Sequence, residues 1–213
     1  MVITISDGKR VGKNFSNGQE YNEIPDAFYS GFNNGDDEYI TIPNPLDGNY
    51  KIEVQGTDDG GEYGVLTSYI SDNFATTTET TGITQPNQIT ELNTTFNNQN
   101  PENLQTERII TLDVLINDIN GAYDLGWIRD KKTRDEFIKR VNAMIKIEKR
   151  IQILEEKDKN GKKVQKKIER LEKVIDKKLA KILLTNLKAY TKGKITEEAY
   201  NIIKADLEYL INN

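Results

Sequence analysis

The basic segment at residues 157–181 is the densest concentration of charge in the sequence and the first candidate for chemistry. It holds 11 Lys and Arg residues, with Glu169, Glu172 and Asp176 interleaved. Such interleaving favours a solvated coiled-coil exterior crossed by salt bridges. The alternative is a surface that binds polyanions. Its candidate residues are Lys162, Lys163, Lys166, Lys167 and Arg170.

The same region lacks the aromatic residues that nucleic-acid binders use. No Phe, Tyr or Trp occurs from Ile138 to Lys188. Proteins that bind single strands without sequence preference stack the bases on aromatic side chains. We therefore expect no specific nucleic-acid partner, and cell-wall polymers and anionic membrane surfaces remain as polyanions.

Acidic turns offer a calcium hypothesis. Ca²⁺ takes six to eight oxygen ligands at flexible spacing. Two expected turns carry adjacent aspartates, although neither has the D-x-[DN]-x-[DN]-G pattern of an EF-hand. Asp is also common in turns for reasons of backbone conformation alone. The candidate ligands are Asp36, Asp37, Asp58 and Asp59.

The absence of Cys and His limits the catalytic chemistry open to the chain. There is no disulfide, thiolate nucleophile or imidazole base, and the usual zinc and haem ligands are missing. Hydrolysis by two carboxylates remains open. With 34 Asp and Glu residues, acidic pairs arise by chance, and the expected elements form no deep cleft. We therefore predict a non-catalytic chain, with calcium as the one candidate cofactor.

The elements that must position these residues fall into two halves of opposite charge. Residues 1–100 hold 4 Lys and Arg against 15 Asp and Glu, a net charge of −11, whereas residues 101–213 hold 25 against 19, a net charge of +6. The first half also has most of the glycines and aromatic residues. This shift predicts two domains. We place a β-sandwich at 1–96, a polar linker at 97–105 and a helical bundle at 106–213.

The first half has the pattern of short antiparallel strands. Residues 50–55 alternate between apolar and polar, and a Gly-rich turn leads into residues 62–70, which we expect to be the hairpin partner. Five aromatic residues precede this hairpin. They have two interpretations, the core of a small sandwich, which we favour, and a surface that stacks on glycans. They are Tyr21, Phe28, Tyr29, Phe32 and Tyr39.

The second half has helical periodicity and predicts four helices, two of them long. Apolar residues recur at steps of three and four before and after a break at residues 158–161, which indicates an antiparallel helical hairpin at 133–190. Thr133 and Glu136 have the spacing of a capping box, and Thr196 is the expected N-cap of the last helix. The fold class is therefore α+β with two segregated domains.

Both halves resemble modules of secreted bacterial proteins. The strand Gly48–Val54, with its Gly-x-Tyr start, and the second Gly-x-Tyr at Gly61–Tyr63 make the first half similar to the pre-peptidase C-terminal β-sandwich. The second half resembles the helical FIMAH module in the stretches 112–116, 126–128 and 193–203, although its central hairpin is longer than in that family. These resemblances imply a non-catalytic accessory region and an extracellular or cell-surface location.

Taken together, the sequence predicts an accessory region of an exported bacterial protein. Its expected work is spacing, contact with another protein, or attachment to substrate or cell wall. The alternatives are polyanion or anionic-membrane binding through the Lys-rich hairpin and, less favoured, hydrolysis by carboxylates. No apolar run approaches the roughly 18 residues of a membrane span.

Overall fold

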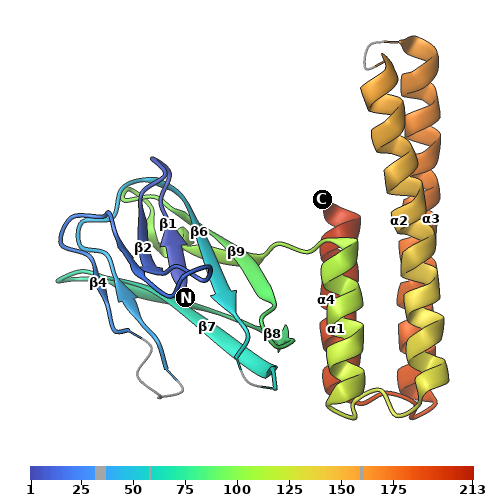
Figure 1. The fold of residues 1–213 in the computed structure, drawn as a ribbon, viewed down its shortest axis with the longest axis horizontal. Helices are drawn as coiled ribbons and strands as arrows, with labels where there is room; N and C mark the ends of the chain where they lie inside the picture. The colour runs from blue at the N-terminus through green and yellow to red at the C-terminus, as the bar shows by residue number, and fades with distance from the viewer. Residues whose placement is uncertain (32–36, 58, 159–160) are drawn as a thin grey trace. The chain divides into compact units, whose positions relative to one another are not determined.

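The computed structural model divides the chain into two compact units, Met1–Ile109 and Ile110–Asn213. It describes residues 1–31, 37–57, 59–158 and 161–213 (Figure 1). The first unit is built of antiparallel β-sheets and the second of four helices. The α+β class with segregated β and α parts is therefore confirmed.

The first unit contains one six-stranded sheet and two two-stranded sheets in its described residues. The large sheet has the order β10-β9-β6-β1-β2-β3, and the small sheets are β4-β5 and β7-β8. The strands are β1 (Val2–Thr4), β2 (Arg10–Lys13), β3 (Glu20–Asn22), β4 (Phe28–Tyr29), β5 (Ile40–Thr41), β6 (Gly48–Gln55), β7 (Gly61–Ile70), β8 (Ala75–Thr84), β9 (Ile89–Phe96) and β10 (Gln105–Arg108), with a 3₁₀ turn η1 (Pro101–Asn103) before β10.

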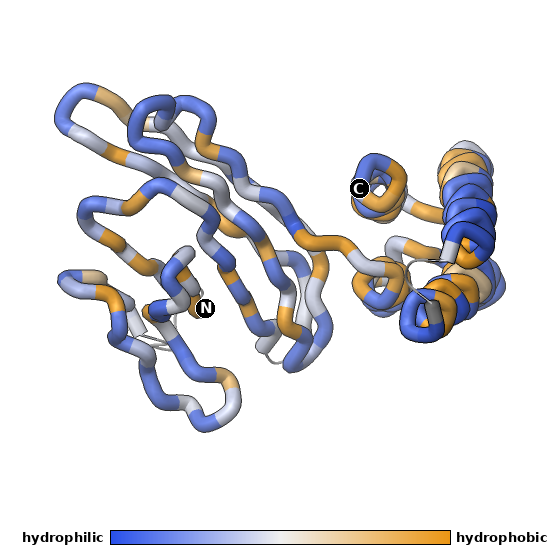
Figure 2. The backbone as a smooth tube through the Cα atoms, turned by 90° about the horizontal axis from the view of Figure 1, so that it is seen from above, coloured by the Kyte–Doolittle hydropathy of each residue, from blue (hydrophilic) through white to orange (hydrophobic). Residues whose placement is uncertain are grey.

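Alternation along the strands gives the large sheet a buried inner face. Ile52 of β6 lies opposite Leu92 of β9, and Val65 of β7 packs against both, so β7 lies over the inner face. Residues at period two point to the same side of a strand, which is why their polar neighbours reach solvent. In Figure 2 the colour changes between hydrophobic and hydrophilic along these strands. The inner face is the core of a sandwich.

The strand pairing corrects one expectation from the sequence. The predicted hairpin of residues 50–55 with 62–70 does not form, because β6 pairs with β1 and β9, whereas β7 pairs with β8. β6 and β7, although adjacent in sequence, therefore belong to different sheets. Gly56, in the connection between them, leaves no room for a side chain, since an added Cβ would lie 2.2 Å from the carbonyl oxygen of Gln85.

The stretch expected to be a linker lies within the first unit, Met1–Ile109. Residues 97–105 contain η1 and the first residue of β10, which pairs antiparallel with β9. The hydroxyl groups of Thr94 and Thr106 lie 2.8 Å apart and are buried between the two strands. The sequence of β10, Gln-Thr-Glu-Arg, does not alternate between apolar and polar residues. The strand can therefore be recognised only from its pairing with β9.

The second unit is a four-helix bundle with one long hairpin. Its helices are α1 (Leu112–Asp124), α2 (Lys131–Asp158), α3 (Lys162–Thr191) and α4 (Glu197–Asn212). α1 packs against α2 and α4, and α3 packs against α2 and α4. Because α3 has 14 residues more than α4, the α2–α3 hairpin extends about 20 Å beyond the short helices. The predicted count of four helices, two of them long, is confirmed.

Two similar loops close the base of the bundle. α1 and α3 each end in a glycine with positive φ, Gly126 at 77° and Gly193 at 64°. In each case the amide of the next residue bonds back to an alanine carbonyl, Trp127 to Ala122 at 2.8 Å and Lys194 to Ala189 at 2.9 Å, which is the Schellman pattern. The loops then pair through an isolated bridge between Ile128 and Ile195. The base is therefore held by backbone hydrogen bonds.

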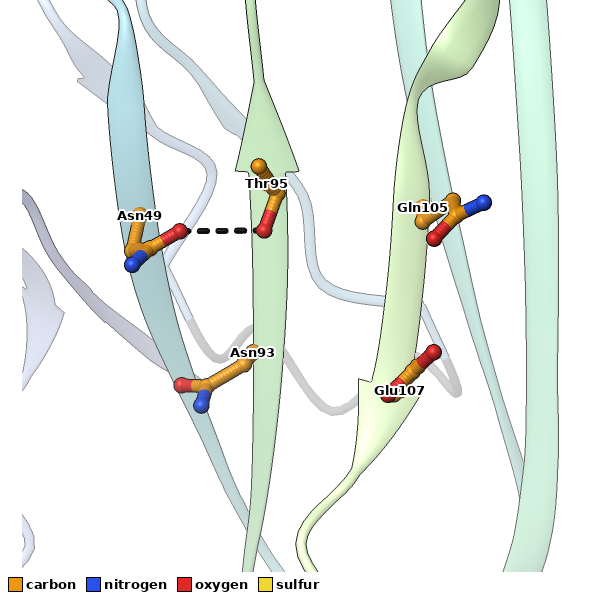
Figure 3. Close-up of a pocket in the computed structure, with 5 residues that line it drawn as sticks. All are labelled: Asn49, Asn93, Thr95, Gln105 and Glu107. Atoms are coloured by element: carbon orange, nitrogen blue, oxygen red, sulfur yellow. Dashed lines mark hydrogen bonds between the residues drawn. The ribbon is translucent and has the colours of Figure 1, made fainter. Parts of the chain in front are cut away.

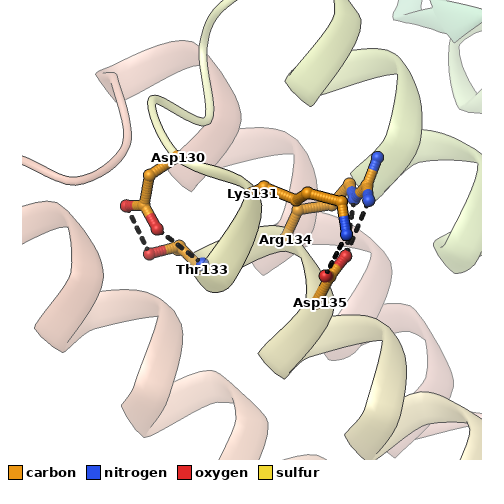
Figure 4. Close-up of polar contacts among 5 residues, drawn as sticks. All are labelled: Asp130, Lys131, Thr133, Arg134 and Asp135. Carbon is orange, nitrogen blue, oxygen red and sulfur yellow. Dashed lines mark hydrogen bonds and ion pairs between the residues drawn. The ribbon is translucent and has the colours of Figure 1, made fainter.

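The start of α2 corrects the predicted capping box. Asp130 accepts hydrogen bonds from the backbone amide and the hydroxyl of Thr133, both at 2.8 Å, and so caps the helix three residues earlier than expected (Figure 4). These bonds, the hydroxyl first, lower the pKa of Asp130. Thr133 itself lies inside the first turn. The other predicted cap is confirmed, since Thr196 accepts from the amide of Ala199.

Candidate functional site

The outer face of α3 carries a continuous row of cations. Ile168, Leu179 and Ile182 of α3 are buried in the unit. Lys166 and Arg170 each lie about 160° around the helix axis from Ile168, and so face away from the core. Cations recur along this outward line at steps of +3, +4, +3, +4 and +4. We call them the α3 stripe: Lys163, Lys166, Arg170, Lys173, Lys177 and Lys181, all exposed.

In the described part of the chain, the cations of the α3 stripe are not held in ion pairs by the carboxylates beside them. Within the part of the chain that the structure describes, none of its six side chains takes part in an ion pair or a side-chain hydrogen bond. By contrast, α2 carries pairs of Lys131 with Asp135 at 2.9 Å, Arg134 with Asp135 at 2.7 Å and Arg140 with Glu136 at 2.6 Å. Figure 4 shows the first two.

The difference between α2 and α3 has an electrostatic consequence. On α2 the cations hold the pKa of Asp135 and Glu136 below the ordinary range through hydrogen bonds from Arg134 and Arg140 respectively. The positive charges of Arg134 and Arg140 are therefore compensated by these neighbouring carboxylates. On α3 the field of six cations along about 27 Å of helix is directed at solvent. The two interpretations drawn from the sequence, a solvated coiled-coil exterior and a polyanion-binding surface, both stay predictions.

The predicted polyanion residues are all exposed on α3. Three of them, Lys163, Lys166 and Arg170, belong to the α3 stripe, whereas Lys162 and Lys167 lie to its sides. The structure thus extends the predicted set towards the base of the hairpin by Lys173, Lys177 and Lys181. The signal for these three was present in the sequence, because a step of three or four residues continues the same line.

The two calcium candidates that the structure describes do not belong to a cluster of possible metal ligands. Asp37 and Asp59 are exposed. Asp36 and Asp58 lie outside the described residues. Among the described His, Cys, Asp and Glu residues, no group of three is placed to hold a metal ion. Calcium binding stays a prediction with its own test.

The aromatic residues divide between core and surface. Tyr29 packs against the core cluster around Val11, and burial followed by its hydrogen bond to Glu38 raises its pKa. Tyr21 lies under the guanidinium of Arg10. Phe28 and Tyr39 are 53% and 58% exposed and contact each other at 5.7 Å between ring centroids. Phe32 lies outside the described residues.

A polar hollow on the first unit was missed by the sequence reasoning. It measures about 250 Å³ and lies on the outer face of the large sheet (Figure 3). Only the pairing of β6, β9 and β10 brings its residues together, and no motif in the sequence marks them. They are Asn49, Asn93, Thr95, Gln105 and Glu107.

Comparison with protein-family models, with curated proteins and with solved structures finds no match for this chain. The two resemblances drawn from the sequence therefore stay predictions. In the described residues, no helix combines the length and the apolar character needed to cross a membrane.

Proposed function

We propose that the chain is a non-catalytic accessory region of an exported bacterial protein, and that its helical unit attaches to anionic polymers or anionic membrane surfaces through the α3 stripe. The observation that carries the proposal is the row of six exposed cations without an ion pair in the described part of the chain. Unpaired cations release no internal partner on binding, so the attraction to a polyanion is not offset by broken salt bridges.

The shape of the helical unit supports attachment by this surface. The projecting part of the hairpin holds Lys163, Lys166, Arg170 and Lys173, and it lies beyond the ends of α1 and α4, the other two helices that the structure describes in this unit. A helix face of this kind can lie along a linear polymer without rearranging. The β-sandwich then serves as a spacer of opposite charge, with −11 over residues 1–100.

The test is retention of the whole chain on immobilised heparin and on vesicles of anionic lipid at low salt. We expect retention that is lost at high salt, because exposed charges are screened within about 10 Å at 0.1 M. The stripe variant replaces Lys166, Arg170, Lys173 and Lys177 with Gln and is expected to elute early. The matched control makes the same change in net charge at exposed lysines elsewhere on the unit, Lys132, Lys139, Lys192 and Lys194.

Two results would count against the proposal. One is passage of the wild-type chain through both supports at low salt. The other is equal retention of the stripe variant and the control, which would show that overall charge, and not the stripe, decides binding. Turnover in a screen of glycosidase and esterase substrates would instead support the carboxylate hydrolase alternative.

A further inference from the structure

The polar hollow of the first unit is a regular grid of side chains on three adjacent strands. In register, Asn49 of β6, Thr95 of β9 and Gln105 of β10 form one row across the sheet. The next row, two residues along each strand, is Lys51, Asn93 and Glu107, and the ammonium of Lys51 is held by Glu53 at 3.1 Å and Glu91 at 3.7 Å. Neighbouring strands lie about 4.8 Å apart, so the grid is about 10 Å wide. Figure 3 shows the five side chains on the same face.

The grid offers hydrogen-bonding groups that the protein itself leaves unused. Thr95 donates to the Asn49 side-chain oxygen at 3.0 Å. The side chains of Asn93, Gln105 and Glu107 form no hydrogen bond or ion pair in the described part of the chain. Two amides present both donors and acceptors, and a carboxylate accepts at both oxygens. The hollow therefore presents donors and acceptors side by side.

The opposite face of the same strands holds the grid in place. Leu92, Thr94 and Thr106 are buried there, and the hydroxyl contact between Thr94 and Thr106 joins β9 to β10. Each strand of the grid is also paired along its length, β9 with both β6 and β10. A ligand would meet a preformed backbone, and only exposed side-chain rotamers would be ordered on binding.

The lining excludes several classes of ligand. The one carboxylate among the five lining residues is too few for calcium, which takes six to eight oxygen ligands. A polyanion would meet the carboxylate of Glu107, and the cation beside the hollow, Lys51, is already paired with Glu53 and Glu91. No apolar side chain lines the hollow, so it does not suit a hydrophobic ligand. The ligand class that remains is a neutral molecule rich in hydroxyl groups, because each hydroxyl can both donate and accept a hydrogen bond.

We propose that this hollow binds a neutral polysaccharide. The amides of Asn93 and Gln105 donate to and accept from sugar hydroxyls, and Glu107 accepts from two adjacent hydroxyls. No aromatic ring lines the site, so binding to a single sugar unit is weak and a polymer gains from repeated contacts. The site is separate from the α3 stripe in residues, in unit and in ligand charge.

The test is affinity electrophoresis of the whole chain in gels that contain soluble starch, glucomannan or xylan. We expect retardation by at least one polymer, unchanged by salt because no ion pair is made. The variant N93A/Q105A/E107Q is expected to bind at least about tenfold more weakly. The control E79Q/T81A changes exposed residues of β8 on the other sheet and keeps full retardation.

The outcomes separate the two surfaces of the molecule. Retardation that survives N93A/Q105A/E107Q overturns the proposal and directs attention to the exposed pair Phe28 and Tyr39. Retardation that vanishes on adding salt, or in the stripe variant, also overturns it. If none of the three polymers retards the wild-type chain, the polysaccharide proposal is overturned as well. This conclusion does not depend on the result of the heparin experiment.

Discussion

Neutralising the α3 stripe should make the helical unit more stable, not less. The four substitutions Lys166→Gln, Arg170→Gln, Lys173→Gln and Lys177→Gln remove every repulsion between successive members of the stripe. Like charges one turn apart on a helix destabilise it by about 0.2–0.5 kcal/mol per pair. Five such neighbour pairs are lost, whereas three opposite-charge neighbours at the same spacing, Lys166–Glu169, Glu169–Lys173 and Lys173–Asp176, each lose a similar attraction, so the net gain is about 0.4–1 kcal/mol at low salt. Gln and Lys have nearly equal helix propensity, so the exchange itself contributes little.

The assay is urea unfolding of the whole chain followed by far-UV circular dichroism, which reports mainly the helices. The gain should shrink in about 1 M salt, where the screening length falls to about 3 Å. The control variant at Lys132, Lys139, Lys192 and Lys194 is not expected to show the same gain. Lower stability of the stripe variant at low salt would refute the reasoning. It would mean that Glu169, Glu172 or Asp176 neutralises the cations after all, as the interleaved sequence alone favours.

Three further predictions test other parts of the account. Gly126→Ala should destabilise the helical unit by about 1 kcal/mol in urea unfolding, because φ is 77° there although the space beside the Cα is open; an unchanged midpoint would contradict the cap. Burial, and then the charge of Asp113, raises the pKa of Glu148, so its carboxylate form weakens the fold as pH rises through and above the ordinary glutamate range. Glu148→Gln should therefore raise the free energy of unfolding by up to about 0.5 kcal/mol near neutral pH and leave it unchanged below that range. A gain seen only at acidic pH would contradict this prediction. Adding EDTA should lower the melting temperature only if the aspartate turns hold calcium, so an unchanged value would reject that hypothesis.

The helices could be predicted from the sequence because their information is local. Apolar steps of three and four residues, with Gly126 and Thr196 at the ends, locate α1 and α4 without any partner. The start of α2 was placed three residues late because Thr133 fits a capping pattern that Asp130 in fact satisfies. Two candidate caps one turn apart cannot be told apart by spacing alone.

The strand pairing could not be predicted in the same way. β6 lies closer in sequence to β7 than to β9, yet it pairs with β9, whereas β7 pairs with β8 in another sheet. The polar hollow depends on this pairing, since Asn49 and Gln105 are 56 residues apart in sequence. The absence of ion pairs along the described α3 stripe was equally out of reach, because it depends on which rotamers the lysines and carboxylates adopt.

The most direct test of the central claim is the salt dependence of binding to a long linear polyphosphate. If all six cations of the α3 stripe contact phosphates, the logarithm of the association constant should fall with the logarithm of salt concentration with a slope of about −4, as for a flexible single strand. That slope means about a 250-fold loss between roughly 50 and 200 mM salt. The stripe variant, with two cations left, should give a slope of about −1.4. Equal slopes for the wild-type chain and the stripe variant would contradict the claim.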